Sequence, residues 1–429
     1  MNGNMIIRNA AQLVTCSGFA AKKGKEMAKL QVIEDGAVII KEGLIEAAGR
    51  TTDIEKQFKK GRADRFDFDT IDARGKAVLP GFVDSHTHLV FGGYRAEEFS
   101  WRLRGDSYME IMQRGGGIVN TVDATRKASR EELTQSGIKR LDSMLSMGVT
   151  TAEGKSGYGL DRETEIKQLE VMAHLDQIHY VDVVRTFLGA HAVPPEYKGR
   201  EDAFIDFMAA EVLPAVGDRK LAEFCDIFCE KTVFSIEQSR RLLTRAKELG
   251  LKLKLHADEI VPLGGAELAA ELGAVSADHL LQASDRGIKD LAAAGVVATL
   301  LPITAFSLKE PYANGRNMID SNCAVALATD FNPGSCFSES IPLVFALATL
   351  YMNMSAEETL SALTINAAAA LDRADKIGSI DAGKQGDLII LEFPSYNYIS
   401  YHIGVSTVEK VIKQGNLVFD KEKGGIIHC

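Results

Sequence analysis

The middle of the chain alternates short apolar runs, rich in β-branched residues, with longer stretches whose apolar positions recur every three or four residues. The short runs predict buried strands, and the longer stretches, such as residues 235–249 and 265–272, predict amphipathic helices. Eight strand and helix units in succession favour a closed, TIM-like (β/α)8 barrel of the α/β class. The expected strands lie near residues 81–88, 149–155, 182–190, 225–230, 251–256, 274–278, 295–300 and 324–329.

Both ends of the chain carry a different pattern. Short apolar runs interrupted by glycines occur around residues 36–45 and again after about residue 376, and such runs are typical of β-hairpins. We therefore expect two domains. Residues 1–75 and 376–429 together form a small β-sandwich domain, and residues 76–375 form the metal-dependent barrel that carries the catalytic site.

A doubly wound parallel sheet is the alternative fold for the central part. The sequence has no Gly-x-Gly-x-x-Gly turn after its first strand and no Walker phosphate loop, so it gives nucleotide binding no support. The longest apolar stretches, residues 291–301 and 341–352, are shorter than the roughly 20 residues that a membrane span requires. We expect a buried strand and a buried helix there.

Composition narrows the range of partners. The chain has 46% hydrophobic and 25% charged residues, as globular proteins do, and its formal net charge of -10 argues against nucleic-acid or membrane partners. Its six cysteines are scattered without a Cys-x-x-Cys pair, as expected in a reducing compartment. Because the N-terminus also lacks a signal-peptide pattern, we expect a cytoplasmic protein that acts on a small molecule.

The first expected barrel strand ends in two histidines. In an extended chain Asp84, His86 and His88 share one face, and imidazoles two positions apart lie roughly 6.5–7 Å from each other, so both can reach one ion. Two unrelated core histidines are the simpler interpretation. A metal site is favoured because the pair follows an apolar run containing Pro80 and Gly81, and because Asp84 could orient a ring nitrogen.

Other polar residues also close expected strands, at the end of a parallel barrel where active sites are built. The fifth strand ends at His256 with Glu259 three residues later, and the sixth ends at His279. His191 follows the third strand and Asp330 ends the eighth. Three imidazoles and one carboxylate suit zinc or iron(II). The predicted metal ligands are His86, His88, His256 and Asp330.

A divalent cation at this position would make a water acidic enough to supply hydroxide and would polarise a substrate carbonyl. Glu259 is the first candidate for the general base and then acid, because it can reach over the metal without binding it. Asp330 could share that task. For His279 two roles stay open, a structural hydrogen bond to a loop or a catalytic contact.

The motif at residues 80–88, together with His256, His279 and Asp330, resembles the amidohydrolase superfamily of metal-dependent hydrolases. A closer resemblance is to the imidazolonepropionase family of histidine catabolism. It covers nearly the whole chain, and the set of its blocks is more specific than the superfamily motif alone. The blocks are residues 84–99, 153–160, 188–191, 256–259 and 328–335.

This resemblance implies hydrolysis of the ring amide of 4-imidazolone-5-propanoate to N-formimidoyl-L-glutamate by a homodimer. It implies one metal ion, Zn2+ or Fe2+/Fe3+, on the four ligands given above. The predicted catalytic residues remain Glu259, His279 and Asp330. Substrate contacts are expected from Arg95, Tyr158, His191, Glu259, Asn332, Gly334 and Ser335.

Two of these positions make chemical sense on their own. The Arg95 guanidinium can pair with a propanoate tail through two hydrogen bonds, and Tyr158, between Gly157 and Gly159, is expected to expose its ring at a loop tip. Members of the superfamily with two metals carry a bridging group after the fourth strand, where Glu230 stands here. We favour a single metal. The alternatives are a purine or pyrimidine aminohydrolase and a non-catalytic barrel.

Overall fold

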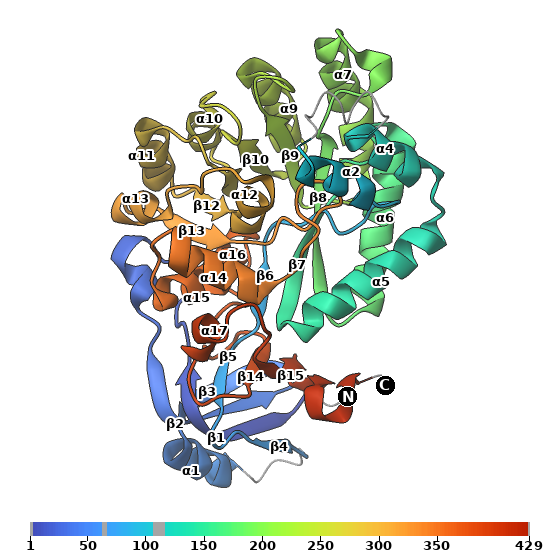
Figure 1. Ribbon diagram of the computed structural model, residues 1–429. Helices are drawn as coiled ribbons and strands as arrows, with labels where there is room; N and C mark the ends of the chain where they lie inside the picture. The colour runs from blue at the N-terminus through green and yellow to red at the C-terminus, as the bar shows by residue number, and fades with distance from the viewer. Residues whose placement is uncertain (1–2, 62–66, 106–115, 428–429) are drawn as a thin grey trace.

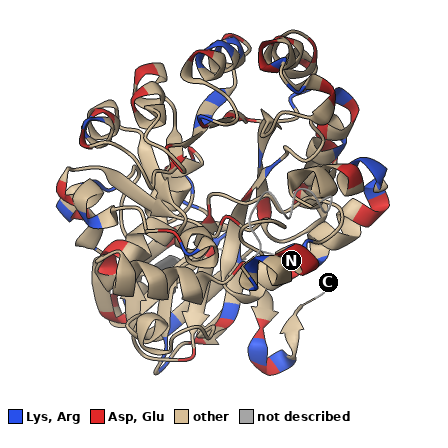
Figure 2. Cartoon of the chain, turned by 45° about the horizontal axis from the view of Figure 1, so that its top comes forward, with Lys and Arg blue, Asp and Glu red and all other residues tan. Residues whose placement is uncertain are grey.

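The structure of the protein is a computed structural model that describes residues 3–61, 67–105 and 116–427. Two sheets organise it. In Figure 1 the strands of the central part are surrounded by helices, and a second sheet lies below them. Charged residues of both signs are interspersed over the outer helices (Figure 2). Within the described ranges, no helix has the length and apolar character needed to cross a membrane.

The central sheet has eight strands, and every neighbouring pair in it is parallel. The first and last strands meet just beyond their ends, where Thr87 pairs with Phe331 and the Asp330 amide donates to the His86 carbonyl at 3.0 Å. This contact closes the barrel, so the predicted (β/α)8 barrel is confirmed and the doubly wound alternative is wrong. The barrel strands are β6 (Phe82–Asp84), β7 (Val149–Lys155), β8 (Asp182–Ala190), β9 (Phe224–Cys229), β10 (Lys252–Ala257), β11 (Ser276–His279), β12 (Val297–Leu300) and β13 (Ala324–Leu327).

The first strand differs from the prediction. The apolar run is divided between β5 (Ala77–Pro80), which belongs to the lower sheet, and β6 in the barrel. At the division, a β-carbon on Gly81 would lie 2.3 Å from the Thr150 hydroxyl oxygen, so a side chain there would not fit. The predicted strand through residue 88 is therefore wrong, because β6 ends at Asp84. Beyond Asp84 the chain still contacts the end of β7, since the Lys155 amide donates to the Thr87 carbonyl at 2.9 Å.

The barrel helices pack one face against the strands. Helix α9 is typical: Ser235 and Gln238 form a capping box at its start, and Leu242 and Leu243 are among its buried residues. The described helices of the central part are α2 (Ala96–Leu103), α4 (Ile118–Lys127), α5 (Arg130–Ser146), α6 (Arg162–Ile178), α7 (Glu201–Phe207), α8 (Leu213–Asp218), α9 (Ile236–Glu248), α10 (Gly265–Leu272), α11 (Asp285–Ala294), α12 (Pro302–Leu308), α13 (Gly315–Asp320), α14 (Ile341–Tyr351), α15 (Ala356–Leu363) and α16 (Ile365–Ala370).

The lower sheet draws strands from both ends of the chain, as predicted. Its strands run in the order β17-β16-β15-β14-β5-β1-β2-β3, with β4 paired to β1. Met5, Ile40, Ile390 and Ile412 are among the residues of its core. Helix α1 (Thr51–Gly61) packs against β2 and β3 of this sheet, whereas the short helix α17 (Tyr398–Tyr401) contacts α14 of the barrel. The strands are β1 (Met5–Val14), β2 (Val32–Lys41), β3 (Leu44–Arg50), β4 (Asp69–Asp72), β14 (Leu388–Leu391), β15 (Val408–Lys413), β16 (Asn416–Asp420) and β17 (Gly425–Ile426), besides β5.

A buried lysine joins the lower sheet to the barrel. Lys413, at the end of β15, donates to the Asp387 carboxylate at 2.6 Å and to the Asp182 carboxylate at 2.7 Å. Asp182 begins barrel strand β8. The ammonium group of Lys413 also donates to the Thr150 carbonyl in β7 at 3.1 Å. This contact fixes how the two sheets meet, on the side of the barrel where β7 and β8 begin.

Candidate active site

A cavity of about 680 Å³ opens at the carboxyl ends of the barrel strands. Its wall contains all but one of the residues expected from the sequence; the exception is His86, which is fully buried. The parallel strands bring these side chains together because their carboxyl ends converge on one face of the barrel. The expected residues in the wall are His88, Arg95, Tyr158, His191, His256, Glu259, His279, Asp330, Asn332, Gly334 and Ser335.

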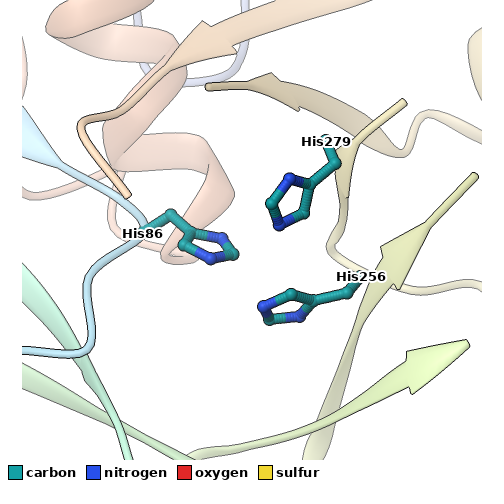
Figure 3. Close-up of side chains that lie close together, drawn as sticks. All are labelled: His86, His256 and His279. Carbon is teal, nitrogen blue, oxygen red and sulfur yellow. The ribbon is translucent and has the colours of Figure 1, made fainter. Parts of the chain in front are cut away.

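The four predicted metal ligands lie close together. His86 Nε2 and His88 Nε2 are 3.4 and 3.6 Å from the same Asp330 oxygen. His86 also offers a nitrogen that lies within 4.8 Å of nitrogens of His256 and His279. Figure 3 shows these three imidazoles converging on one space. Geometry alone thus admits His279 as a further ligand beside its predicted catalytic role.

The chemistry of this group fits a divalent cation. His86 Nε2 and His256 Nε2 are buried, and within the described protein neither has a hydrogen-bond partner. Burial lowers the pKa of His86, His88 and His279 well below the usual value, so these rings are neutral, the form that binds metal. Burial also acts against the charged form of His256, but the Asp226 carboxylate outweighs it and raises that pKa. Imidazoles with one carboxylate suit zinc or iron.

The carboxylate that orients His86 is not the one expected. Asp84 accepts hydrogen bonds from the Thr329 amide at 3.0 Å and from its hydroxyl at 2.6 Å, so it ties β6 to the end of β13. Instead, His86 Nδ1 lies 2.7 Å from an Asp278 oxygen. The predicted orienting role of Asp84 is therefore wrong: its carboxylate bonds across the barrel seam, and Asp278 reaches the ring from β11.

Three residues at or just beyond the ends of strands beside the site adopt left-handed backbone conformations. Asp258, His279 and Asp330 have φ values of 49°, 74° and 54°. Such angles are costly for residues other than glycine and are concentrated at functional sites. His279 is the last residue of β11, Asp258 directly follows β10, and Asp330 follows β13 by three residues.

The loop that carries Glu259 is fastened on both sides. The Asp258 carboxylate accepts from the amides of Gly264, Gly265 and Ala266 at the start of α10. The Glu230 carboxylate accepts from the Ile260 amide at 2.8 Å. Glu259 Oε1 consequently stands 3.5 Å from His279 Nδ1.

Glu259 is suited to proton transfer. Burial, followed by the negative charge of Asp330, raises the pKa of the Glu259 carboxyl group to about 8. Burial also raises the pKa of Asp330 to about 6, although the Thr304 hydroxyl, which donates at 2.6 Å, acts against that rise. Two carboxyl groups that titrate near neutrality are therefore present in one cavity, as acid and base catalysis requires.

Glu230 does not stand in a metal-binding group. Its second oxygen accepts from the Lys231 amide at 2.8 Å, and among the described residues it belongs to no cluster of potential ligands. The structure gives this carboxylate a different task, which is to hold the loop after β10.

Tyr158 does not lie at an exposed loop tip. Its side chain is 3% exposed, and its ring centroid is 5.8 Å from that of His88 and 6.1 Å from that of Phe91. Glu165 accepts from the amides on either side of it and turns the loop inward. The predicted exposure is wrong because this buried carboxylate, from helix α6, decides the direction of the loop. The ring lines the cavity instead, as does His191, which stacks on His88 at 4.9 Å.

The far wall is built by a loop after β13. Asn332 Oδ1 accepts from the amides of Gly334 and Ser335, both at 2.8 Å, while its Nδ2 donates to the Asp330 carbonyl at 2.7 Å. Asn332 thus shapes the loop as well as lining the cavity. A β-carbon at Gly334 would lie 2.3 Å from an Arg95 Nη atom, so the guanidinium packs directly against this glycine.

Arg95 is held by a residue that the sequence interpretation missed. Its Nε donates to Glu98 Oε2 at 2.8 Å, and the same oxygen accepts from the Gly117 amide at 3.0 Å. Glu98 is 6% exposed. The sequence did contain a signal for this pair, since Arg95 and Glu98 are three residues apart at the start of helix α2 and such residues are neighbours.

The other missed group is a set of charged residues inside apolar strands, where a charge has to be paired. They are Glu153, Lys155, Asp226, Lys254 and Asp278.

Comparison with known proteins agrees with this geometry. Profiles described as the amidohydrolase family match residues 230–418 and 69–126. An imidazolonepropionase of Clostridium tetani is 62% identical over 98% of this chain and 99% of its own, and one of Parabacteroides distasonis is 61% identical over 97% and 99%.

Solved structures agree on the fold. An adenosine deaminase of Xanthomonas campestris with bound zinc aligns over 99% of this chain and 94% of its own with a TM-score of 0.69; at 18% identity it shows the fold alone. The family assignment rests on the sequence relatives, which match this chain over nearly their whole length. On that basis the chain belongs to the imidazolonepropionase family of the amidohydrolases.

Proposed function

We propose that this protein hydrolyses the ring amide of 4-imidazolone-5-propanoate to N-formimidoyl-L-glutamate, with one Zn2+ or iron ion held by its predicted ligands, His86, His88, His256 and Asp330. One observation carries the proposal. A single cavity joins a metal-competent group of imidazoles and a carboxylate to a guanidinium that can hold an anionic tail, in a chain 62% identical to an imidazolonepropionase.

Arg95 binds the propanoate tail in this proposal. Its Nε is committed to Glu98, and its Nη side faces Gly334, where the lack of a side chain leaves room for the guanidinium. A planar guanidinium pairs with a carboxylate through two parallel hydrogen bonds, which fixes the orientation of the substrate as well as its position. The ring of the substrate then reaches toward the imidazole cluster in the same cavity.

A bound divalent cation would polarise the ring carbonyl and increase the acidity of water. Glu259 takes the proton from the attacking water and delivers it to the ring nitrogen as the carbon–nitrogen bond breaks. The added oxygen becomes part of the new carboxylate. His279 orients the Glu259 carboxyl group, from which its Nδ1 lies 3.5 Å away. Asp330 is the alternative base.

The proposal is tested with purified protein loaded with Zn2+ or, without oxygen, with Fe2+. We expect the ultraviolet absorbance of imidazolone propanoate to disappear, with a product that has gained one water and no release of ammonia. An aminohydrolase would release ammonia in a coupled assay. A non-catalytic barrel would leave the absorbance unchanged in every metal condition, and either result would contradict the proposal.

Replacing Glu98 by glutamine should raise KM about tenfold and change kcat little. Glutamine keeps the packing but removes the charge that orients Arg95, and a hydrogen bond to a charged group contributes about 1.5–3 kcal/mol. Steady-state kinetics at saturating metal measure the effect. Glu97→Gln, an exposed neighbour on the same helix, is the control and should leave KM unchanged. A lower kcat with unchanged KM in Glu98→Gln would argue against this role.

A further inference from the structure

Five fully buried charged side chains lie beneath the imidazole cluster, and we call them the basal charge cluster. They come from four barrel strands, the neighbours β9, β10 and β11 and, on the other side of β8, strand β7. Each of them has a side-chain exposure of 0%. The members are Glu153, Lys155, Asp226, Lys254 and Asp278.

Lys155 is the centre of this cluster. Its ammonium nitrogen donates to Asp226 Oδ2 at 2.7 Å and to Asp278 Oδ2 at 3.4 Å, and it lies 3.0 Å from Glu153 Oε2. The other Glu153 oxygen is 3.0 Å from the Lys254 nitrogen. One ammonium group on β7 therefore joins carboxylates of two other strands, β9 and β11.

The same two carboxylate oxygens also meet the candidate ligands. Asp226 Oδ2 is 3.0 Å from His256 Nδ1, and Asp278 Oδ2 is 2.7 Å from His86 Nδ1. A continuous path therefore runs from one imidazole through Lys155 to the other. The outer carboxylate oxygens are fixed separately, because Asp226 Oδ1 accepts from the His256 amide and Asp278 Oδ1 from the Ser276 hydroxyl.

Packing does not explain the cluster. Buried ion pairs are expensive, and apolar residues of similar volume often stabilise a core equally well or better. The cluster contains two ammonium groups and three carboxylates, so it keeps one net negative charge. Groups behind a metal ligand fix the ring orientation and influence metal affinity.

We propose that Lys155 is a positioning residue of the metal centre, which bridges Asp226 and Asp278 and thereby fixes the His256 and His86 imidazoles relative to each other. The inference rests on the proposed metal site, but it does not depend on the identity of the substrate. Asp226 on β9 and Asp278 on β11 each support one imidazole, and Lys155 on β7 in turn holds both carboxylates.

The test is Lys155→Met, which keeps the length of the side chain and removes its charge. Zn2+ alone is the probe, and its dissociation constant is measured by competition with a chelating indicator. We expect an affinity about 10- to 100-fold weaker than that of the unaltered protein. The visible d–d absorption of the Co2+-loaded protein should change as well, because that spectrum reports the arrangement of the ligands.

Lys413→Met is the matched control. Lys413 is also a buried lysine between two carboxylates, but it joins the lower sheet to the barrel. This variant should lower Tm while leaving Zn2+ affinity and the Co2+ spectrum unchanged. If Lys155→Met folds, binds Zn2+ as tightly as the unaltered protein and keeps its Co2+ spectrum, Lys155 is only structural and the proposal is wrong.

A second comparison serves if Lys155→Met does not fold. The double variant Lys155→Met/Asp226→Asn removes one charge of each sign and is compared with Asp226→Asn alone. We expect weaker Zn2+ binding in the double variant, because it also frees Asp278 behind His86; equal affinities would overturn the proposal. If the unaltered protein does not bind one Zn2+ per chain, the proposed metal site fails first, and this inference with it.

Discussion

Replacing Glu259 by glutamine is expected to lower kcat by about 10²- to 10⁴-fold while the metal content stays unchanged. Glutamine fills the same space between the fastened loop and His279, but it cannot accept and return a proton. The carboxyl group lies in the cavity wall and its pKa of about 8 is set by burial and by Asp330, so its charge state is available for transfer near neutral pH. Single-turnover rates and metal analysis on the same preparation measure the two quantities.

Glu248→Gln is the control for this change, because Glu248 is exposed on helix α9, away from the cavity. It should not affect turnover. A near-normal kcat in Glu259→Gln would move the role of base to Asp330 or His279. Loss of metal in that variant would instead show that Glu259 takes part in holding the ion.

Replacing Arg95 by alanine is expected to lower kcat/KM by roughly 30- to 4,000-fold. Removing one partner of a buried, hydrogen-bonded charge pair costs about 2–5 kcal/mol, and every 1.4 kcal/mol is about a factor of ten. The Arg95 side chain is 17% exposed, so water cannot replace the guanidinium effectively. Most of the loss should be in KM, and the metal content should not change. Steady-state kinetics and metal analysis measure both.

Arg102→Ala provides the comparison for Arg95. Arg102 lines the same cavity from the last turn of α2, and its Nη2 is 3.4 Å from the Ser307 hydroxyl. If a general positive field held the substrate, both variants would lose similar affinity. If Arg95 forms a specific pair, Arg102→Ala should have a much smaller effect. A fall in metal content in Arg95→Ala would contradict the role assigned to it.

The fold was largely predictable from local patterns. Strands β7 and β8 coincide with the expected residues 149–155 and 182–190, and helix α10 coincides with 265–272. Each of these segments is bounded by polar residues or glycine, and each strand belongs to one sheet only. The run at residues 77–88 serves two sheets. Periodicity cannot show where such a run changes partner, because β5 and β6 have the same apolar character.

The sequence predicted the site residues that stand at the ends of strands. It did not predict which side chains of different strands contact each other. His256 and Asp330 could be placed together because parallel strands of one barrel end on one face. The contact between Asp278 and His86 joins β11 to the segment after β6, and nothing in the local sequence specifies that pairing. Tyr158 shows the same limit, since Glu165 on the following helix decides its direction.

The position of β5 has a consequence for biosynthesis. In the lower sheet β5 lies between β1, which precedes it in the chain, and β14, which begins only at Leu388. The barrel seam likewise joins the segment after β6 to residues beyond β13. The segment that carries His86 and His88 therefore gains its second neighbour only when the residues that follow β13 have been synthesised, so the barrel cannot close around the site while β6 and β7 alone are available.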